Sequence, residues 1–235
     1  MYSIEGRVRY SEIDKTGKLS LPAVLDYFQD CSTFHSEDIG VGITYLEKLH
    51  CAWLMSAWQI VVTRYPRMGE RIKIVTFPYE FKNFLGLRNF YMEDEAGQQI
   101  ACANSIWTYM DMEAGRPVRL PQEMQDAYVL SDRLPMEYAP RKIPILKEGV
   151  RQEPLVIKRH HLDTNHHVNN GQYLRIAMDY IGADAVVKQM RAEYKKSAVL
   201  GDIMIPSLIQ EKDIVTIILS QDNGDIYAVI ELTMA

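Results

Sequence analysis

The sequence lacks a disulfide framework, a zinc motif and a run long enough to cross a membrane. It has 3 cysteines in 235 residues, and Cys31, Cys51 and Cys102 show neither a CxxC nor a zinc-type spacing. The most apolar run, residues 51–62, is interrupted by polar residues and is too short to span a bilayer. We therefore expect reduced cysteines, and we expect residues 51–62 to form a buried strand.

The chain also lacks an excess of positive charge, since its net charge is −5. We therefore expect no nucleic-acid partner and no membrane partner, and an acidic protein partner would require a local basic patch. The first residues contain no apolar signal core, so we expect a cytoplasmic protein. Apolar residues make up 47% and charged residues 24%, which is typical of a soluble globular protein.

Prolines are concentrated in one part of the chain, since 6 of the 10 lie between positions 117 and 154. Strand-like alternation stops there, which is typical of a connection between domains. The sequence therefore predicts three parts: an N-terminal domain over residues 1–116, a proline-rich linker over 117–150 and a C-terminal domain over 151–235.

The two halves repeat each other at a shift of 149 residues, which aligns Asp14 with Asp163. An amphipathic helix follows each aspartate, and the aligned Ser20 and Asn169 are good N-cap residues. Strand patterns follow each helix, joined by hairpin turns that end at Gly97 and Gly224. We expect an α+β fold of two copies, each an antiparallel sheet around one helix, paired as a pseudo-dimer within one polypeptide.

Four of the six histidines lie within residues 160–167, directly before the second helix. Histidine titrates near neutral pH, and Asp163 and Asn165 between the histidines can orient partners through hydrogen bonds. The cluster therefore predicts a place where water or a carbonyl group is activated.

Three stretches together resemble the acyl-acyl carrier protein (acyl-ACP) thioesterases, a family built from two tandem hot-dog domains. Residues 163–170 resemble its Asp-x-Asn-x-His-Val-Asn-Asn motif, and residues 64–69 resemble Arg-Tyr-Pro-x-Trp-Gly, with Met68 replacing the tryptophan. Residues 105–121 resemble the strand and proline exit of the first domain. The resemblance implies hydrolysis of the thioester between a fatty acyl chain and acyl carrier protein, with fatty acid biosynthesis as the setting and no cofactor.

The resemblance assigns the functional Asp, Asn and His of the family to Asp163, Asn165 and His167. A second family motif, Glu-Tyr-Arg-Arg-Glu-Cys, departs here, because Ser197 replaces its second glutamate and Ala198 replaces its cysteine. A serine cannot act as a base at neutral pH. Either the Ser197 hydroxyl passes a hydrogen bond to water, or Glu193 supplies the charge if residues 191–197 form a regular strand.

The second half contains no cysteine, which favours attack by water over attack by a thiol. His167 is the best candidate general base, Asn165 could orient water or substrate, and Asp163 could brace the loop. Backbone N–H groups of Val168, Asn169 and Asn170 could stabilise the oxyanion at the start of the helix. The first copy has Thr16 and Lys18 in place of Asn165 and His167, so we expect one active site per chain.

The first half is then available to hold the acyl chain. We expect an apolar tunnel, whose depth sorts chain lengths at roughly 0.8 kcal/mol per buried methylene, lined by Leu21, Val24, Leu25, Phe28, Trp53, Met55 and Trp58. An acidic carrier protein would need a basic patch, and the candidates close to the site in sequence are Lys188, Arg191, Lys195 and Lys196.

Several alternatives remain open from the sequence. A metal site could use His160, His161, Asp163, His166 and His167, but the spacing matches no common zinc motif, so we expect no metal and treat His160, His161 and His166 as surface or packing residues. An acyl-CoA thioesterase of the hot-dog type and a non-catalytic acyl-binding or carrier-binding protein are the rival functions. Both a monomer and a homodimer fit the sequence.

Overall fold

The structure, a computed structural model, describes residues 1–182 and 184–235 and divides the chain into two compact units. Unit 1 comprises Met1–Ser56 and Ile60–Tyr138, and unit 2 comprises Ala57–Gln59 and Ala139–Ala235. Most of the segment expected as a linker therefore belongs to unit 1. Its residues Leu120, Met124 and Tyr128 are buried in one cluster with Val41 and Tyr109, which explains why they group with the first unit.

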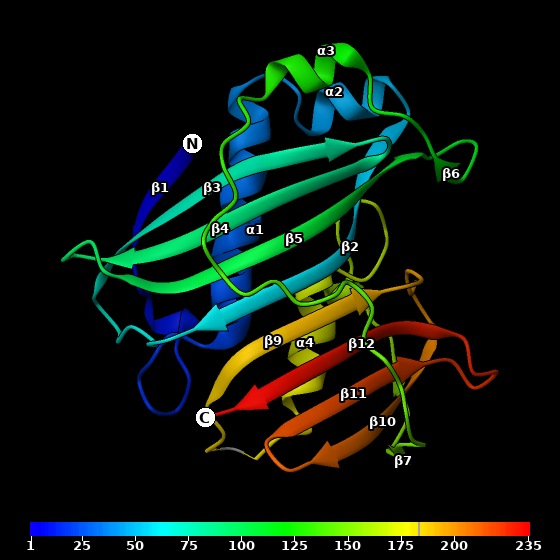
Figure 1. Ribbon diagram of the computed structural model, residues 1–235. Helices are drawn as coiled ribbons and strands as arrows, with labels where there is room; N and C mark the ends of the chain where they lie inside the picture. Colours follow the sequence, from blue (N-terminus) through cyan, green and yellow to red (C-terminus); the bar gives the residue numbers. More distant parts are fainter. Residues whose placement is uncertain (183) are drawn as a thin grey trace. The chain divides into compact units, whose positions relative to one another are not determined.

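Unit 1 is an antiparallel sheet with one long helix, α1 (Leu21–Asp38), against it (Figure 1). The strand order is β1-β3-β4-β5-β2. The strands are β1 (Tyr2–Arg7), β2 (Cys51–Val62), β3 (Arg71–Lys82), β4 (Leu85–Asp94) and β5 (Gln99–Asp111). Short elements complete the unit: η1 (Tyr10–Glu12), α2 (Ile43–Lys48), β6 (Arg116–Pro117) and α3 (Gln122–Ala127).

Helix α1 begins where the sequence predicts. The Ser20 hydroxyl accepts a hydrogen bond from the Ala23 N–H at 3.3 Å, and Pro22 lies in the first turn, where its missing N–H costs nothing. The residues at the expected helical spacing are all buried: Leu21, Val24, Leu25 and Phe28. This apolar face packs against the sheet and forms the core of unit 1.

Unit 2 repeats this plan with a shorter helix, α4 (Asn170–Met178), against a sheet of order β9-β12-β11-β10-β7. Its elements are β7 (Val150–Arg151), β8 (Leu155–Val156), η2 (Arg159–His161), β9 (Val187–Tyr194), β10 (Ile203–Glu211), β11 (Ile214–Ser220) and β12 (Ile226–Met234). The predicted N-cap is confirmed, because Asn169 Oδ1 accepts the Gly171 N–H at 2.8 Å. The expected α+β plan of two helix-and-sheet copies is therefore present, and the pairing of the copies stays a prediction.

The hairpin predictions are confirmed, and two details of the strands differ from expectation. Gly97 and Gly224 adopt φ angles of +74° and +89° in the turns between β4 and β5 and between β11 and β12. The regular strand considered over residues 191–197 is not formed, because β9 ends at Tyr194. Strands β3 and β10 were not predicted individually, since Pro78 and Pro206 interrupt their patterns.

Among the described residues, no helix combines the length and the apolar character that crossing a membrane requires.

Candidate active site

The loop that leads into α4 is held by one carboxylate. Asp163 Oδ1 accepts the N–H groups of Asn165 at 2.8 Å and of His167 at 3.2 Å, and the Asp163 N–H donates to the His167 carbonyl at 2.8 Å. This is the bracing role that the sequence suggested for Asp163. His166 turns the chain in the left-handed region, with a φ angle of +61°.

The same loop is fixed to the segment that follows β9. His167 forms an isolated β-bridge with Val199, and the Val168 N–H donates to the Ala198 carbonyl at 2.9 Å. The Ala198 N–H in turn donates to the hydroxyl of Tyr173 on α4 at 2.9 Å. His167 therefore sits on backbone that is tied to both the helix and the sheet, which fixes where its side chain begins.

Unit 1 contains the same loop with different side chains. Asp14 Oδ1 accepts the N–H groups of Thr16 at 2.8 Å and of Lys18 at 3.3 Å, and Gly17 takes the turn with a φ angle of +76°. Lys18 forms an isolated bridge with Arg67, as His167 does with Val199. The repeat therefore extends to individual hydrogen bonds, and the two loops differ in chemistry rather than in backbone.

The side chains of His167 and Asn165 lie on this loop of unit 2 without a hydrogen bond among the described residues. His167 is half-buried and Asn165 is exposed. An imidazole in this position can accept a proton from water.

Two of the three N–H groups proposed to stabilise the oxyanion already donate to backbone carbonyls. The Val168 N–H donates to Ala198, and the Asn169 N–H donates to the His161 carbonyl at 2.9 Å. Among the three amides, only that of Asn170 has no acceptor within the described part of the chain. Because Asn170 is the first residue of α4, its N–H lies at the positive end of the helix dipole.

Glu193 lies away from this helix start. Its Oε2 accepts the N–H of the buried residue Ile143 at 3.0 Å, whereas the hydroxyl of the neighbouring Tyr194 donates to the Asn170 carbonyl at 3.1 Å. Successive residues of a strand point to opposite faces, so Glu193 faces away from α4. The role considered for Glu193 required a regular strand over residues 191–197, and this condition is not met because β9 ends at Tyr194.

Ser197 is exposed and precedes Ala198, which carries the bonds to Val168 and Tyr173. It is therefore two residues from Val199, the bridge partner of His167. A hydrogen-bonding role for its hydroxyl stays a prediction.

His161 has a structural role. Its Nδ1 accepts the Lys158 N–H at 3.0 Å in the short 3-10 helix η2. Burial, together with the charges of His160 and Lys158, lowers the pKa of His161, which keeps this acceptor nitrogen unprotonated. No group of three or more His, Cys, Asp or Glu side chains in the described chain could hold a metal ion.

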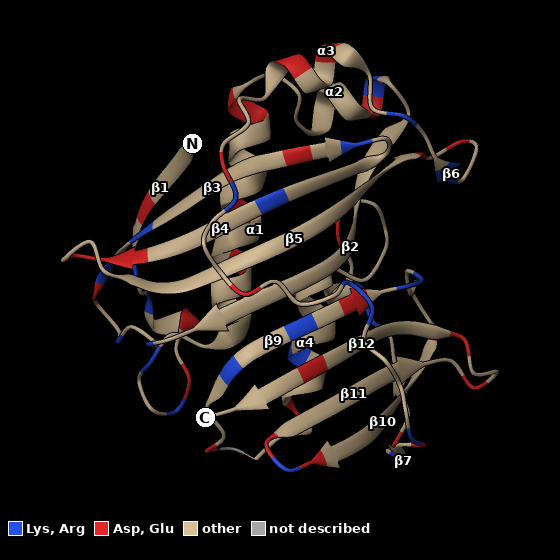
Figure 2. Ribbon diagram, in the orientation of Figure 1, with Lys and Arg blue, Asp and Glu red and all other residues tan. Residues whose placement is uncertain are grey.

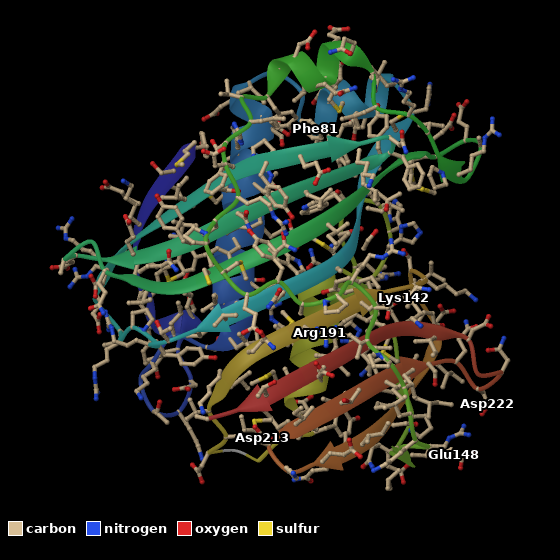
Figure 3. All side chains as sticks on the ribbon, viewed as in Figure 1. Phe81, Lys142, Glu148, Arg191, Asp213 and Asp222 are labelled. Atoms are coloured by element: carbon tan, nitrogen blue, oxygen red, sulfur yellow. The ribbon has the colours of Figure 1, made fainter. Side chains whose placement is uncertain are left out.

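The four basic residues predicted to dock a carrier do not form one patch. Arg191 donates to Glu231 at 2.7 Å and to the carbonyls of Pro140 and Lys142 at 2.8 and 3.0 Å, so its guanidinium is already engaged (Figure 3). The exposed Lys188 lies three residues earlier on β9 and therefore points to the opposite face.

The other two basic residues follow the end of β9. Lys196 pairs with Asp225 at 2.9 Å, and Lys195 lies 3.8 Å from Glu193. We therefore exclude Arg191 from the predicted carrier-docking surface, because its enclosed guanidinium cannot also contact a partner. The docking role of Lys188, Lys195 and Lys196 stays a prediction.

Two tyrosines that the sequence analysis missed support the site. Burial raises the pKa of Tyr173 to about 12 and also raises that of Tyr194, so both hydroxyls stay protonated at neutral pH. Their rings pack edge to face at 5.7 Å between centroids, and their hydroxyls bond to Ala198 and Asn170. The sequence signal was the position of Tyr173 on the buried stripe of α4.

The side chains proposed to line a tunnel are mostly buried in the core. Met55 is buried on β2, with Trp53 on the same strand stacked against Phe81 and tilted against Tyr109. Trp58, also buried, belongs to the three residues that group with unit 2. Packing explains these positions without a ligand, and their role in binding an acyl chain stays a prediction.

Sequence profiles of one family match both halves of the chain. The acyl-ACP thioesterase N-terminal domain matches residues 1–128, and the acyl-ACP thioesterase C-terminal domain matches residues 146–232. The chain is 25% identical to a chloroplastic acyl-[acyl-carrier-protein] hydrolase of Cuphea viscosissima, over 92% of this chain and 58% of that protein. It is 24% identical to oleoyl-acyl carrier protein thioesterase 2 of Arabidopsis thaliana, also chloroplastic, over 84% of this chain and 59% of that protein.

The chain thus spans less than two thirds of these relatives, but it matches solved structures over nearly their whole length. It superposes on an acyl-ACP thioesterase from Bacteroides thetaiotaomicron with a TM-score of 0.89 and 19% identity, covering 99% of this chain and 97% of that one. For the 12:0-ACP thioesterase from Umbellularia californica the TM-score is 0.86 at 17% identity, covering 100% and 96%. These likenesses confirm the predicted tandem fold.

Proposed function

Because the chain belongs to the acyl-ACP thioesterase family, we propose that it hydrolyses fatty acyl-ACP thioesters to free fatty acid and acyl carrier protein. The observation that carries the proposal is the unoccupied imidazole of His167, on a loop braced by Asp163 next to the free N–H of Asn170. These groups supply a proton acceptor and an oxyanion donor, which are the two needs of hydrolysis by water.

In this mechanism His167 removes a proton from water as the water oxygen bonds to the thioester carbonyl carbon. The Asn170 N–H stabilises the negative charge that develops on the carbonyl oxygen, and the Asn165 amide orients the water. The carbon–sulfur bond then breaks, and the imidazolium returns the proton to the departing phosphopantetheine sulfur. A general base of this kind contributes roughly 10²–10⁴-fold to the rate.

The acyl chain is assigned to unit 1, whose core along α1 is apolar. The relatives above are named for oleoyl and 12:0 substrates, so we infer a fatty acyl chain without choosing its length. Hydrolysis rates across a series of acyl-ACP substrates would identify the preferred chain.

The test of the site is to replace His167 by alanine and to measure kcat on acyl-ACP. We expect a fall of about 10²–10⁴-fold, because the general base is removed. His160→Ala is the matched control, since it removes a nearby exposed imidazole outside the turn and should leave kcat close to that of the wild type. Retained turnover by His167→Ala would show that another group is the base.

Two other functions remain candidates. An acyl-CoA thioesterase of this fold would have the higher kcat/KM on acyl-CoA when both carriers bear the same acyl group. A non-catalytic acyl-binding or carrier-binding protein is favoured by Ser197, which stands where the family has a carboxylate. That function would be supported if the wild type turned over neither substrate. A cytoplasmic location and a monomeric or homodimeric state stay predictions.

A further inference from the structure

The loop of unit 1 that repeats the candidate active site carries several cationic side chains. Four positions that hold Val156, Thr164, His167 and Val199 in unit 2 hold Arg7, Lys15, Lys18 and Arg67 in unit 1. The correspondence rests on equivalent bonds, because Asp14 braces Lys18 as Asp163 braces His167, and Lys18 bridges to Arg67 as His167 does to Val199.

Two acidic side chains near this loop, Asp14 and Glu70, accept hydrogen bonds from neighbouring groups. Asp14 accepts the N–H groups of Thr16 and Lys18, and Glu70 accepts the Arg67 N–H at 2.7 Å and a bond from Arg64 at 2.8 Å. Burial acts to raise the pKa of Asp14, but the hydrogen bonds from Thr16 and Lys18 outweigh it and lower that pKa. These carboxylates therefore hold the turns, and within the described residues neither Lys18 nor Arg67 forms an ion pair with them.

Glu12 is engaged in a similar way and lies 3.7 Å from the guanidinium of Arg9, while the exposed Asp30 on α1 interacts electrostatically with both residues. Its Oε2 accepts the hydroxyl of Tyr27 and the N–H of Arg9, each at 2.8 Å. In unit 2 the equivalent position is His161, which caps the same short helix without a negative charge. The aligned 3-10 helix of unit 1 thus adds the exposed Arg9 to the basic surface.

Two exposed apolar side chains lie among these cations. Tyr10 is 82% exposed and Met68 is 54% exposed, and they flank the loop in the 3-10 helix and in the turn after β2. Tyrosine, methionine and arginine are the residue types enriched in protein interfaces. Lys and Arg segments occur both in the loop before α1 and in the turn between β2 and β3 (Figure 2).

We propose that this surface, formed by Arg7, Arg9, Tyr10, Lys15, Lys18, Arg67 and Met68, docks the acidic face of the acyl carrier protein. The inference rests on the proposed function, which supplies the partner. A chain with a net charge of −5 repels an acidic protein at long range, so association needs a local positive surface. In this proposal the loop of unit 1, which has Thr16 and Lys18 in place of Asn165 and His167, serves to recognise the carrier.

The test combines two reversals, Lys18→Glu and Arg67→Glu, in the full chain. Binding of holo acyl carrier protein is measured by titration at low salt, without turnover. We expect an affinity loss of about tenfold, which shrinks as salt is added, because steering by exposed charges is screened. A milder pair, Lys18→Gln with Arg67→Gln, should give a smaller loss in the same direction and guards against misfolding.

The matched control reverses two exposed cations, Lys82 and Arg119. Lys82 ends β3, and the N–H of Leu120, the residue after Arg119, donates to the Asn83 carbonyl at 3.0 Å, so both cations lie near that end of the strand. This control makes the same change of net charge and should leave carrier binding unchanged. If the control weakens binding equally, or if only Lys195→Glu with Lys196→Glu weakens it, the docking surface is wrong. Binding of anionic phospholipid vesicles with no binding of the carrier would also overturn it.

Turnover separates this inference from the proposed function. Wild type and the Lys18→Glu/Arg67→Glu variant are compared on acyl-ACP and on acyl-N-acetylcysteamine, an uncharged thioester without a carrier. We expect kcat/KM to fall about tenfold on acyl-ACP alone. Equal losses on both substrates would refute docking. A wild type that binds the carrier but hydrolyses neither thioester would refute the proposed function and leave the docking surface supported by the titration.

Discussion

Asp163 uses one carboxylate oxygen to accept two backbone N–H groups, so its bracing role needs an acceptor more than a charge. We predict that Asp163→Asn retains most of the kcat, because the amide oxygen can accept the same bonds. Asp163→Ala should lower kcat by tenfold or more at unchanged secondary structure, since the loop that carries His167 loses its brace. Kinetics on acyl-ACP and far-UV circular dichroism check this pair.

The opposite pattern is equally informative. If Asp163→Asn is as damaged as Asp163→Ala, the charge itself takes part in the reaction, and Asp163 acts as more than a brace. The aligned Asp14→Ala in unit 1 is the control, because it removes the same bonds from a loop without His167.

Arg191 gives a prediction about stability. Its side chain and that of Glu231 are 12% and 16% exposed, and two carbonyls share the guanidinium. Arg191→Ala should lower the free energy of unfolding by about 2–3 kcal/mol, because it leaves an uncompensated carboxylate in the interior. Lys188→Ala, an exposed neighbour, should change it by less than about 0.5 kcal/mol. Urea unfolding measures the unfolding free energy of both variants. Equally small losses in both would show that Arg191 contributes no more to stability than an exposed residue.

At the scale of elements, the first turn of α4 affects both the stability of the fold and the rate of the reaction. Asn169→Ala removes the cap on the Gly171 N–H, so we predict a loss of about 1 kcal/mol in unfolding free energy together with a lower kcat. The kinetic effect follows because the first turn positions the Asn170 N–H. Asn169→Ser keeps a capping oxygen and should restore both quantities. An unchanged kcat in Asn169→Ala would remove Asn170 from the mechanism.

Which elements the sequence reveals depends on how local their causes are. The caps at Ser20 and Asn169 and the hairpin turns at Gly97 and Gly224 are set by a few adjacent residues, and they were predicted. Strands β3 and β10 contain prolines that a strand tolerates only where the ladder allows it. In β3 the register shifts between Pro78 and Glu80, which depends on the neighbouring strand β4 and is invisible in the sequence.

The site residues likewise divide into those that the sequence predicts and those that only the structure reveals. The motif predicts Asp163, Asn165 and His167 because they lie together in the chain. The exclusion of Glu193 required the structure, since it depends on which sheet face Ile143 contacts. The engagement of Arg191 by Pro140 and Lys142 likewise joins residues about 50 positions apart. Charge alone could not distinguish a buried guanidinium from an exposed one.

At the scale of the whole molecule, acid should weaken unit 1 before unit 2. Burial, and then the charge of Arg88, lowers the pKa of His35 on α1 to about 4. An unfolded histidine has a pKa near 6.5, so between pH 6.5 and 4 the unfolded chain binds a proton that the folded chain does not. Stability is complete above pH 6.5 and falls, as pH falls to 4, by on the order of 3 kcal/mol.

Native-state hydrogen exchange at pH 7 and pH 5 measures this effect for each unit. Protection should fall more in α1 and β3 than in β11 and β12. In His35→Gln the excess loss in unit 1 should disappear, because no titrating group remains at that position. A uniform loss across both units would assign the acid sensitivity to other groups.

The braced loop has one more consequence, for protein engineering. Its shape depends on one aspartate, on backbone bonds and on a residue with positive φ. The side chains between these anchoring residues can therefore be exchanged. Residues 15–18 and 164–167 have the same length and the same anchoring points. Transplanting either set into the other loop, or a third set into both, changes surface chemistry while the chain path is kept. The molecule therefore has two loops of the same backbone shape that can carry different side chains.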